Sequence, residues 1–148
     1  MSLALGNMEK KSYLCTMEKW KDIKGYEGLY QVSNYGRVKR VNGSIKCNGV
    51  HGIYNKIVSE RLLVPVKTSN KWYLSVNLSK DNNKKIHDIH RLVAEAFIRN
   101  PNKYPVVMHI DNNGYNNCVD NLMWGTYKMN NIQPVIEKRA ANQYGKYK

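Results

Sequence analysis

The clearest alternation of apolar and polar positions lies in the middle of the chain. Residues 72–79 carry apolar side chains at every second position, which predicts a strand with one buried face formed by Leu74, Val76 and Leu78. Residues 81–84 are polar, which predicts a turn, and residues 85–88 predict the returning strand. This part of the chain is therefore expected to form an antiparallel hairpin.

The spacing of the apolar positions becomes helical directly after this hairpin. The residues that share the apolar face are Ile89, Leu92, Val93, Ala96 and Phe97. This spacing predicts a helix over residues 89–98, with Asp88 as its N-cap. Asn100 and Pro101 follow, and proline ends a helix because it lacks a backbone donor.

The N-terminal half predicts a smaller antiparallel β module. Residues 29–32 and 37–41 are expected as short strands joined by a turn at residues 33–36. The expected aromatic anchors of this hairpin are Trp20, Tyr26 and Tyr30. Residues 42–62 contain Asn-Gly turn signals without a periodic pattern, so we expect a variable loop region there.

The last part of the chain predicts a strand, a long loop, a second strand and a helix. An apolar run ends at His109, an Asx-rich loop spans residues 111–117, and residues 122–125 form the second expected strand. Thr126 is a favourable N-cap for a helix over residues 127–141. The order of strands and helices along the chain predicts the α+β class.

The length of 148 residues allows one ordinary domain or two very small ones. We expect a leader over residues 1–16, whose first seven residues are either native or an added leader, and a β module over residues 17–66. A second domain is expected over residues 67–141, and a basic tail over residues 142–148.

The charge balance is strongly basic. The chain has 24 Lys and Arg against 11 Asp and Glu, which gives a formal net charge of +13. This balance indicates a polyanionic partner, and nucleic acid is the leading candidate. The side chains predicted to contact phosphates are Arg37, Lys39, Arg40, Lys80, Lys84, Lys85, Lys138 and Arg139.

Membrane, secreted and zinc-dependent classes are disfavoured by the sequence. The longest apolar run, residues 62–66, is far shorter than the roughly 18 residues that a membrane-spanning helix needs. The first residues lack the pattern of a signal peptide, so a soluble intracellular protein is expected. The 3 cysteines include no Cys-x-x-Cys pair, which argues against a disulfide framework and against structural zinc.

Two motifs in the chain carry a family resemblance. The first is W-x-x-I-x-G-Y-E-G-x-Y-x-V-S-N, which begins at Trp20. The second combines H-R-L-V-A-x-A-F from His90, V-x-H-x-D from Val107 and N-L-x-W from Asn121. The second set resembles the core of HNH endonucleases of the phage-type and intron-encoded homing branch, and the first resembles a module that often precedes it. Their occurrence together and in order is more specific than either alone.

The resemblance implies a ββα-metal domain after the N-terminal module, with double-stranded DNA as the substrate. In that family pattern His109 matches the general base that activates water, and an imidazole suits this role near neutral pH. Asn121 matches the residue that orients the histidine across the hairpin loop. Asn130 matches a ligand of one divalent cation, and its amide oxygen suits Mg²⁺ or Mn²⁺.

The sequence departs from the family pattern at Met108, directly before the expected base. This position usually carries a second metal ligand, and a thioether is a poor ligand for a hard cation. Asp111 could substitute only after a local shift of the chain, since residues three apart on a strand do not point alike. The departure keeps open a protein of another class, namely a DNA-binding protein with an HNH fold and a lost metal site.

Several residues near the expected site are assigned supporting roles. His90 and Arg91 open the helix that follows the middle hairpin, and we expect them to pack or bond near the site. Asn117 is expected as a turn former of the loop. The leading hypothesis is thus a metal-dependent DNA endonuclease of phage or mobile-element type that nicks or cuts the duplex. Its expected location is the cytoplasm of a bacterium or a phage-infected cell. A basic RNA-associated protein is the weaker alternative.

Overall fold

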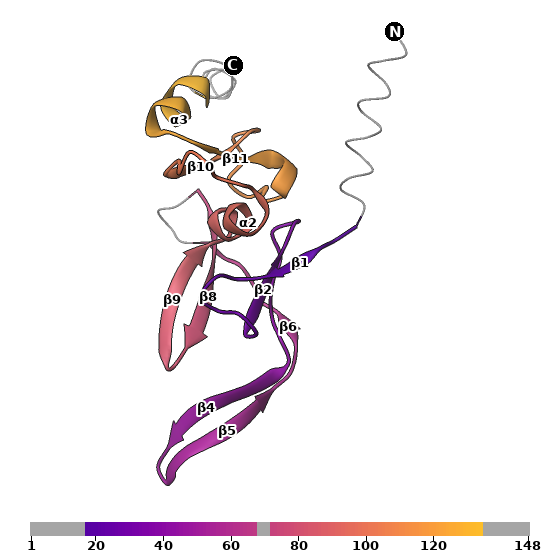
Figure 1. The fold of residues 1–148 in the computed structure, drawn as a ribbon, viewed down its shortest axis with the longest axis vertical. Coiled ribbons are helices and arrows are strands. Elements are labelled where there is room, and N and C mark those ends of the chain that lie inside the picture. The colour runs from indigo at the N-terminus through magenta and orange to yellow at the C-terminus, as the bar shows by residue number, and fades with distance from the viewer. Residues whose placement is uncertain (1–16, 68–71, 135–148) are drawn as a thin grey trace, which may run out of the picture.

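The computed structural model describes residues 17–67 and 72–134 of the chain, which form an α+β fold (Figure 1). The elements of the first half are β1 (Trp20–Asp22), β2 (Tyr30–Ser33), β3 (Val38–Arg40), β4 (Gly43–Gly49), β5 (Gly52–Val58), β6 (Arg61–Leu62) and β7 (Val66–Lys67). Those of the second half are β8 (Leu74–Lys80), β9 (Asn83–Asp88), α2 (Ile89–Phe97), β10 (Val106–His109), the 3-10 turn η1 (Val119–Asn121), β11 (Leu122–Gly125) and α3 (Tyr127–Pro134).

The N-terminal β module is a four-stranded antiparallel sheet in the order β1-β2-β3-β6. Its inner face carries Tyr30, Val32 and Val38, all of which are buried. The β2–β3 hairpin confirms the predicted pair of short strands, and its turn occupies the predicted residues.

The prediction of a loop over residues 42–62 is wrong. Strands β4 and β5 pair in continuous register from Gly43↔Val58 to Gly49↔Gly52, and they project from the rest of the fold as a long ribbon (Figure 1). Of the residues in the ribbon only Val58 is buried. Because neither face packs on a core, the apolar positions show no strand periodicity, and the strands satisfy their hydrogen bonds with each other.

The middle hairpin and its helix follow the prediction closely. Strands β8 and β9 pair antiparallel, β7 adds a third strand at the β8 edge, and α2 begins directly after β9. Asp88 occupies the N-cap position of α2 but makes no side-chain capping bond there. Its carboxylate instead accepts a hydrogen bond of 2.8 Å from the Ser75 hydroxyl, which ties β9 to β8.

A single hydrophobic core joins the two halves of the chain. Helix α2 contacts β2, both strands of the middle hairpin and both strands of the β10–β11 hairpin (Figure 1). The buried members of this core are Ile23, Tyr26, Tyr30, Val32, Val38, Val76, Leu78, Ile89, Leu92, Val93, Ala94, Val107 and Leu122. The expected domain boundary between residues 66 and 67 stays a prediction.

Some predictions fall outside the described residues. They are the leader over residues 1–16, the tail over 142–148, the extension of α3 to residue 141, and the phosphate contacts of Lys138 and Arg139. Within the described ranges, the model contains no helix long and apolar enough to cross a membrane.

Candidate functional site

The site predicted around His109 lies on the β10–β11 hairpin. The two strands pair antiparallel, with Met108 opposite Met123 and His109 opposite Leu122. Since side chains alternate along a strand, His109 shares a face with Val107, which belongs to the core, and Met108 lies on the other face. The side chains of Met108 and His109 therefore do not point to one common place.

The loop between the two strands is closed by Asn121 and Asp111. The Asn121 amide nitrogen donates 2.8 Å hydrogen bonds to the Asp111 carboxylate and to the backbone oxygen of Asn116, while its oxygen accepts from the Asp111 backbone N–H at 3.0 Å. The Asp111 carboxylate also accepts from the Asn116 side chain and from the backbone of Asn113, each at 2.8 Å. Asn121 thus bonds across the loop, while its predicted orienting effect on His109 stays a prediction, and both carboxylate oxygens of Asp111 are used within the loop.

This network perturbs the ionisation of Asp111. Partial burial raises the pKa of the carboxyl, but the hydrogen bonds from Asn116, Asn113 and Asn121 outweigh it and leave the pKa below the ordinary value of 3.8. A carboxyl whose folded-state pKa is lowered stabilises the fold above its ordinary pKa, and the contribution is lost as the pH falls through the folded-state value.

We expect Asp111→Asn to destabilise the protein at neutral pH and to have a smaller effect under acid conditions. The variant lacks the charge that the three loop donors favour, whereas the wild type loses the same charge when Asp111 is protonated. Thermal unfolding of both proteins from pH 7 down to about pH 3 measures the difference. A constant gap in melting temperature over this range would contradict the assignment, and Asp120→Asn, in the adjacent 3-10 turn, is the control.

His109 is held by Asn117. The Nε2 atom of His109 lies 2.9 Å from the Asn117 side-chain oxygen, and both residues are buried. A carboxamide oxygen only accepts hydrogen bonds, so Nε2 is the donor, and in the neutral imidazole Nδ1 then carries the lone pair. Asn117 therefore has a more specific role than the turn former that the sequence predicts, because it sets the tautomer of the predicted base.

Two further rings pack against the His109 imidazole. Tyr73, just before β8, stacks on it at 5.6 Å between ring centroids with an interplanar angle of 13°. His90, at the start of α2, meets it edge-on at 5.2 Å and also contacts Tyr73 at 4.6 Å. The supporting position predicted for His90 thus agrees with the geometry. Tyr73 was not predicted, since its place beside an alternating strand carries no signal of contact with a residue 36 positions later.

The neighbouring Arg91 braces the approach to β10. Its guanidinium donates a 3.3 Å hydrogen bond to the backbone oxygen of Pro105, which precedes β10. Arg91 is exposed, in contrast to the buried His90. The two residues therefore support the hairpin from different sides, His90 through the ring cluster and Arg91 through the backbone.

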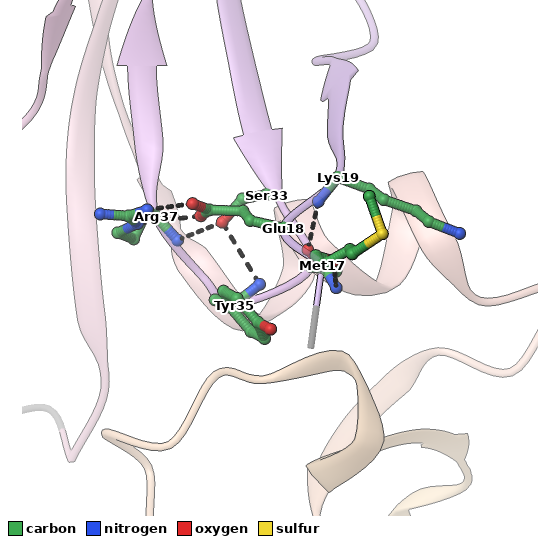
Figure 2. Close-up of polar contacts among 7 residues, drawn as sticks. Met17, Glu18, Lys19, Ser33, Tyr35 and Arg37 are labelled. Carbon is green, nitrogen blue, oxygen red and sulfur yellow. Dashed lines mark hydrogen bonds and ion pairs between the residues drawn. The ribbon is translucent and has the colours of Figure 1, made fainter. Parts of the chain in front are cut away.

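Some of the side chains predicted to contact phosphates form ion pairs within the protein. Arg37 forms an ion pair with Glu18, which holds the pKa of that carboxyl below its usual value. Lys39 pairs with Glu60 at 3.3 Å and lies 4.6 Å from the centre of the Trp20 ring. Figure 2 shows the Arg37–Glu18 pair beside Ser33.

The other described side chains that are predicted to contact phosphates differ in their interactions within the protein. Arg40 donates to the backbone oxygen of Ser59 at 3.4 Å, and Lys80 donates to that of Gly25 at 2.8 Å. Lys84 and Lys85 lie on β9 with exposed side chains. Both side chains are therefore open to solvent, and their contact with a phosphate backbone stays a prediction.

Comparison with known proteins shows which proteins this chain resembles. Residues 18–79 match the family described as the NUMOD4 motif. An uncharacterised HNH endonuclease of Acanthamoeba polyphaga mimivirus is 38% identical over 112 residues, covering 76% of this chain and 28% of the relative. The DNA endonuclease I-HmuI of Bacillus phage SP01 is 36% identical over 112 residues, covering 76% of this chain and 55% of the relative.

The fold agrees with the sequence relationship. A solved structure that describes DNA binding and cleavage by the HNH homing endonuclease I-HmuI aligns with this chain. The TM-score is 0.62 and the sequence identity is 33%. The alignment covers 86% of this chain and 66% of that chain. The chain is thus similar in sequence and in fold to HNH endonucleases. It spans between about a quarter and just over half the length of the curated relatives named above.

HNH endonucleases generally depend on a divalent metal ion, which raises the question of whether these residues could hold one. Met108, at one of the two predicted ligand positions, is 7% exposed. Its Sδ and Cε atoms lie 3.1 and 2.7 Å from the point where a Cβ on Gly125 would stand, so the thioether packs over that glycine. The side chain therefore acts as a core residue of the hairpin.

Asn130 is the second predicted ligand and lies in α3. Thr126 caps this helix as predicted, accepting a 3.2 Å hydrogen bond from the backbone of Met129. Within residues 17–67 and 72–134, no three His, Cys, Asp or Glu side chains are grouped so that they could hold a metal ion. With one amide oxygen and one thioether at the HNH ligand positions, the residues do not make a complete site for a hard cation.

Proposed function

We propose that this protein is a DNA endonuclease of the phage HNH type, which hydrolyses phosphodiester bonds in double-stranded DNA with His109 as general base. The observation that carries the proposal is the 2.9 Å contact between His109 Nε2 and the Asn117 oxygen. It leaves Nδ1 as the proton acceptor of the ring. I-HmuI, with which the chain shares its fold, is described as a DNA-binding and DNA-cleaving enzyme.

The chain's own residues have distinct tasks in this proposal. His109 Nδ1 takes a proton from the water that attacks the phosphorus, and Asn117 keeps the ring in the tautomer that can do so. Asn121 and Asp111 hold the loop that carries Asn117. Tyr73 and His90 restrict rotation of the imidazole by packing on its face and edge. General bases of this kind contribute about 10²- to 10⁴-fold to the rate.

For the cation we propose Mg²⁺ or Mn²⁺ in preference to zinc. Asn130 supplies a hard oxygen, and Mg²⁺ in particular is commonly bound through few protein ligands together with waters and substrate phosphates. An assay of supercoiled plasmid with and without each metal ion tests the proposal. Nicking or linearisation that requires Mg²⁺ or Mn²⁺ is the expected result. Binding without any cleavage under all these conditions contradicts it.

A second function is favoured by the environment of Met108. Its thioether packs over Gly125 where HNH endonucleases commonly place a metal ligand, so the chain has the features of a DNA-binding protein whose metal site is lost. In that case the protein binds duplex DNA with the same salt dependence but leaves plasmid intact in Mg²⁺ and Mn²⁺. The same plasmid assay, paired with a binding assay, separates the two functions.

We expect the double substitution Lys84→Ala and Lys85→Ala to weaken DNA binding and to reduce its dependence on salt. Each phosphate neutralised by a lysine contributes about 0.9 to the slope of log K against log salt, so loss of both contacts lowers the slope by about 2. Binding isotherms of a labelled duplex at several salt concentrations measure this slope.

The matched control removes the same charge from lysines that are engaged within the protein. Lys21 donates to the backbone oxygen of Ala96 at 3.0 Å, and the Lys67 ammonium lies 5.0 Å from the centre of the Tyr115 ring. The double substitution Lys21→Ala and Lys67→Ala therefore changes the net charge equally. An equal change of slope in both double variants would show that the effect is one of bulk charge and would contradict the assignment to β9.

A further inference from the structure

The turn that joins β2 to β3 packs against the loop that holds the predicted base. This turn, residues 33–37, lies within residues 18–79, which match the NUMOD4 motif. The Ser33 hydroxyl accepts hydrogen bonds from the backbone N–H groups of Tyr35 and Arg37 at 3.2 and 3.1 Å, which fixes the turn from within (Figure 2). Ser33 is fully buried, so the turn is a rigid part of the fold.

Asn34 connects this turn to two other parts of the chain. Its side chain accepts from the Lys19 backbone at 2.7 Å and donates to the Met17 backbone oxygen at 3.3 Å, at the start of β1. Its own backbone oxygen accepts a 2.8 Å hydrogen bond from the Val119 N–H, two residues after Asn117. Asn34 is buried, and these bonds anchor the loop of the β10–β11 hairpin to the N-terminal sheet.

Gly36 brings the two segments into direct contact. A Cβ at this position would lie 2.7 Å from the Asn117 Cβ and 3.0 Å from the Asn117 backbone oxygen, closer than real Cβ atoms approach. Gly36 also has a φ of +79°, which disfavours other residues. The backbone of the turn therefore touches Asn117 at a point where no side chain fits between them.

Asn117 is the residue that sets the tautomer of His109. Its backbone is pressed against Gly36, and the chain two residues later is bonded to Asn34, while its side-chain oxygen lies 2.9 Å from His109 Nε2. We propose that Asn34 and Gly36 of the N-terminal module are positioning residues of the nuclease site, acting through Asn117 on His109. The expected effect on the cleavage rate rests on the proposed function. The expected effect on which nitrogen of the His109 ring carries the proton does not.

The test uses Gly36→Ala with Gly28→Ala as its matched control. Gly28 has a φ of +72°, close to that of Gly36, but a Cβ there would meet nothing within 4 Å. Both variants therefore carry the same conformational strain, and only Gly36→Ala displaces Asn117. We expect Gly36→Ala to lower the single-turnover cleavage rate at saturating enzyme by about 10-fold or more, with DNA affinity little changed, and Gly28→Ala to keep the wild-type rate.

A double-mutant cycle separates positioning from a general loss of stability. In the Asn117→Ala background the hydrogen bond to His109 is already absent, so Gly36→Ala should then cause little further loss of rate. Equal fractional losses in both backgrounds would mean that Gly36 acts independently of Asn117 and would overturn the proposal.

An NMR measurement of the imidazole nitrogens keeps the inference separate from the proposed function. In the wild type we expect His109 to carry its proton on Nε2, and in Gly36→Ala to shift towards the spectrum of Asn117→Ala, with no shift in Gly28→Ala. If this pattern holds but the wild type cuts no DNA, the proposed function fails and the positioning role stands. If the wild type cuts DNA and both glycine variants match it in rate and spectrum, the positioning role is overturned.

Asn34→Ser provides a second route should Gly36→Ala fail to fold. The shorter side chain cannot reach both the Lys19 N–H and the Met17 oxygen, while the turn itself is retained. The expected result is a smaller shift of the His109 nitrogen signals in the same direction. An unchanged His109 spectrum in a folded Asn34→Ser protein contradicts the proposal.

Discussion

Replacing His109 by alanine is expected to lower the rate of plasmid nicking by about 10²-fold or more, because the variant removes the proposed general base. The fold should survive, since the loop is closed by Asn121 and Asp111 through bonds that do not involve the imidazole. DNA affinity should also be retained, as the predicted phosphate contacts lie elsewhere. Single-turnover cleavage at saturating enzyme measures the chemical step directly.

His51→Ala is the control for this experiment. His51 lies at the exposed tip of the β4–β5 ribbon, far along the chain from the site, and its replacement should leave the cleavage rate unchanged. A His109→Ala protein that melts like the wild type and still cleaves at its rate would remove His109 from the mechanism. Equal losses in both variants would point to an effect unrelated to the site.

The substitution Met108→Asp is expected to have the second large effect. A carboxylate beside the proposed base supplies the hard oxygen that the thioether lacks, so half-maximal nicking should require at least about tenfold less Mg²⁺ or Mn²⁺. Met108 is 7% exposed, so the new charge is costly until a cation pairs with it. The metal-free variant should therefore melt below the wild type, and added Mg²⁺ should raise its melting temperature.

Met123→Asp is the matched control on the opposite strand. Met123 pairs with Met108 in the register of the hairpin but is 38% exposed, so the control introduces the same carboxylate into the same sheet at a more solvated point. We expect no metal-dependent change in its melting temperature. If Met108→Asp also shows neither a metal-dependent melting temperature nor a changed metal requirement, position 108 has no part in cation binding.

The wild type's own metal requirement decides between the two proposed functions. Efficient nicking by the wild type at low Mg²⁺ would show that Asn130, waters and phosphate oxygens suffice, and the lost-site function would be excluded. Cleavage that appears only in Met108→Asp would show that the thioether alone prevents catalysis and that the rest of the site is intact.

The sequence predicted those elements whose apolar face packs on the common core. Helix α2 is the clearest case, because Leu92 and Val93 are buried at the spacing from which the helix was predicted. The β4–β5 ribbon was missed for the opposite reason, since its strands pair only with each other and show no buried face. Asp88 shows a finer limit: its position at the N-cap was predicted, but its bond to Ser75 depends on strand pairing.

The sequence predicted the site residues that lie close together in the chain. It did not predict the contacts between residues that are far apart in the sequence. His109 and Asn121 occur in a short motif, and the loop hydrogen bonds around Asn121 join residues within ten positions of each other. Tyr73, by contrast, reaches His109 only because β8 and β10 are brought together around α2. The contact of Gly36 with Asn117 joins residues 81 positions apart, and the glycine alone predicts a turn without indicating what touches it.

The β4–β5 ribbon has a consequence for how this protein can be altered. Seven-residue strands on each side pair in register, and Val58 is the one residue of the ribbon that is buried. Cross-strand pairs can therefore be removed or added in twos without opening the core that positions the hairpin of His109. The ribbon's length is thus an adjustable dimension, one that protein engineering can vary to change the reach of the molecule while the remainder of the fold is left as it is.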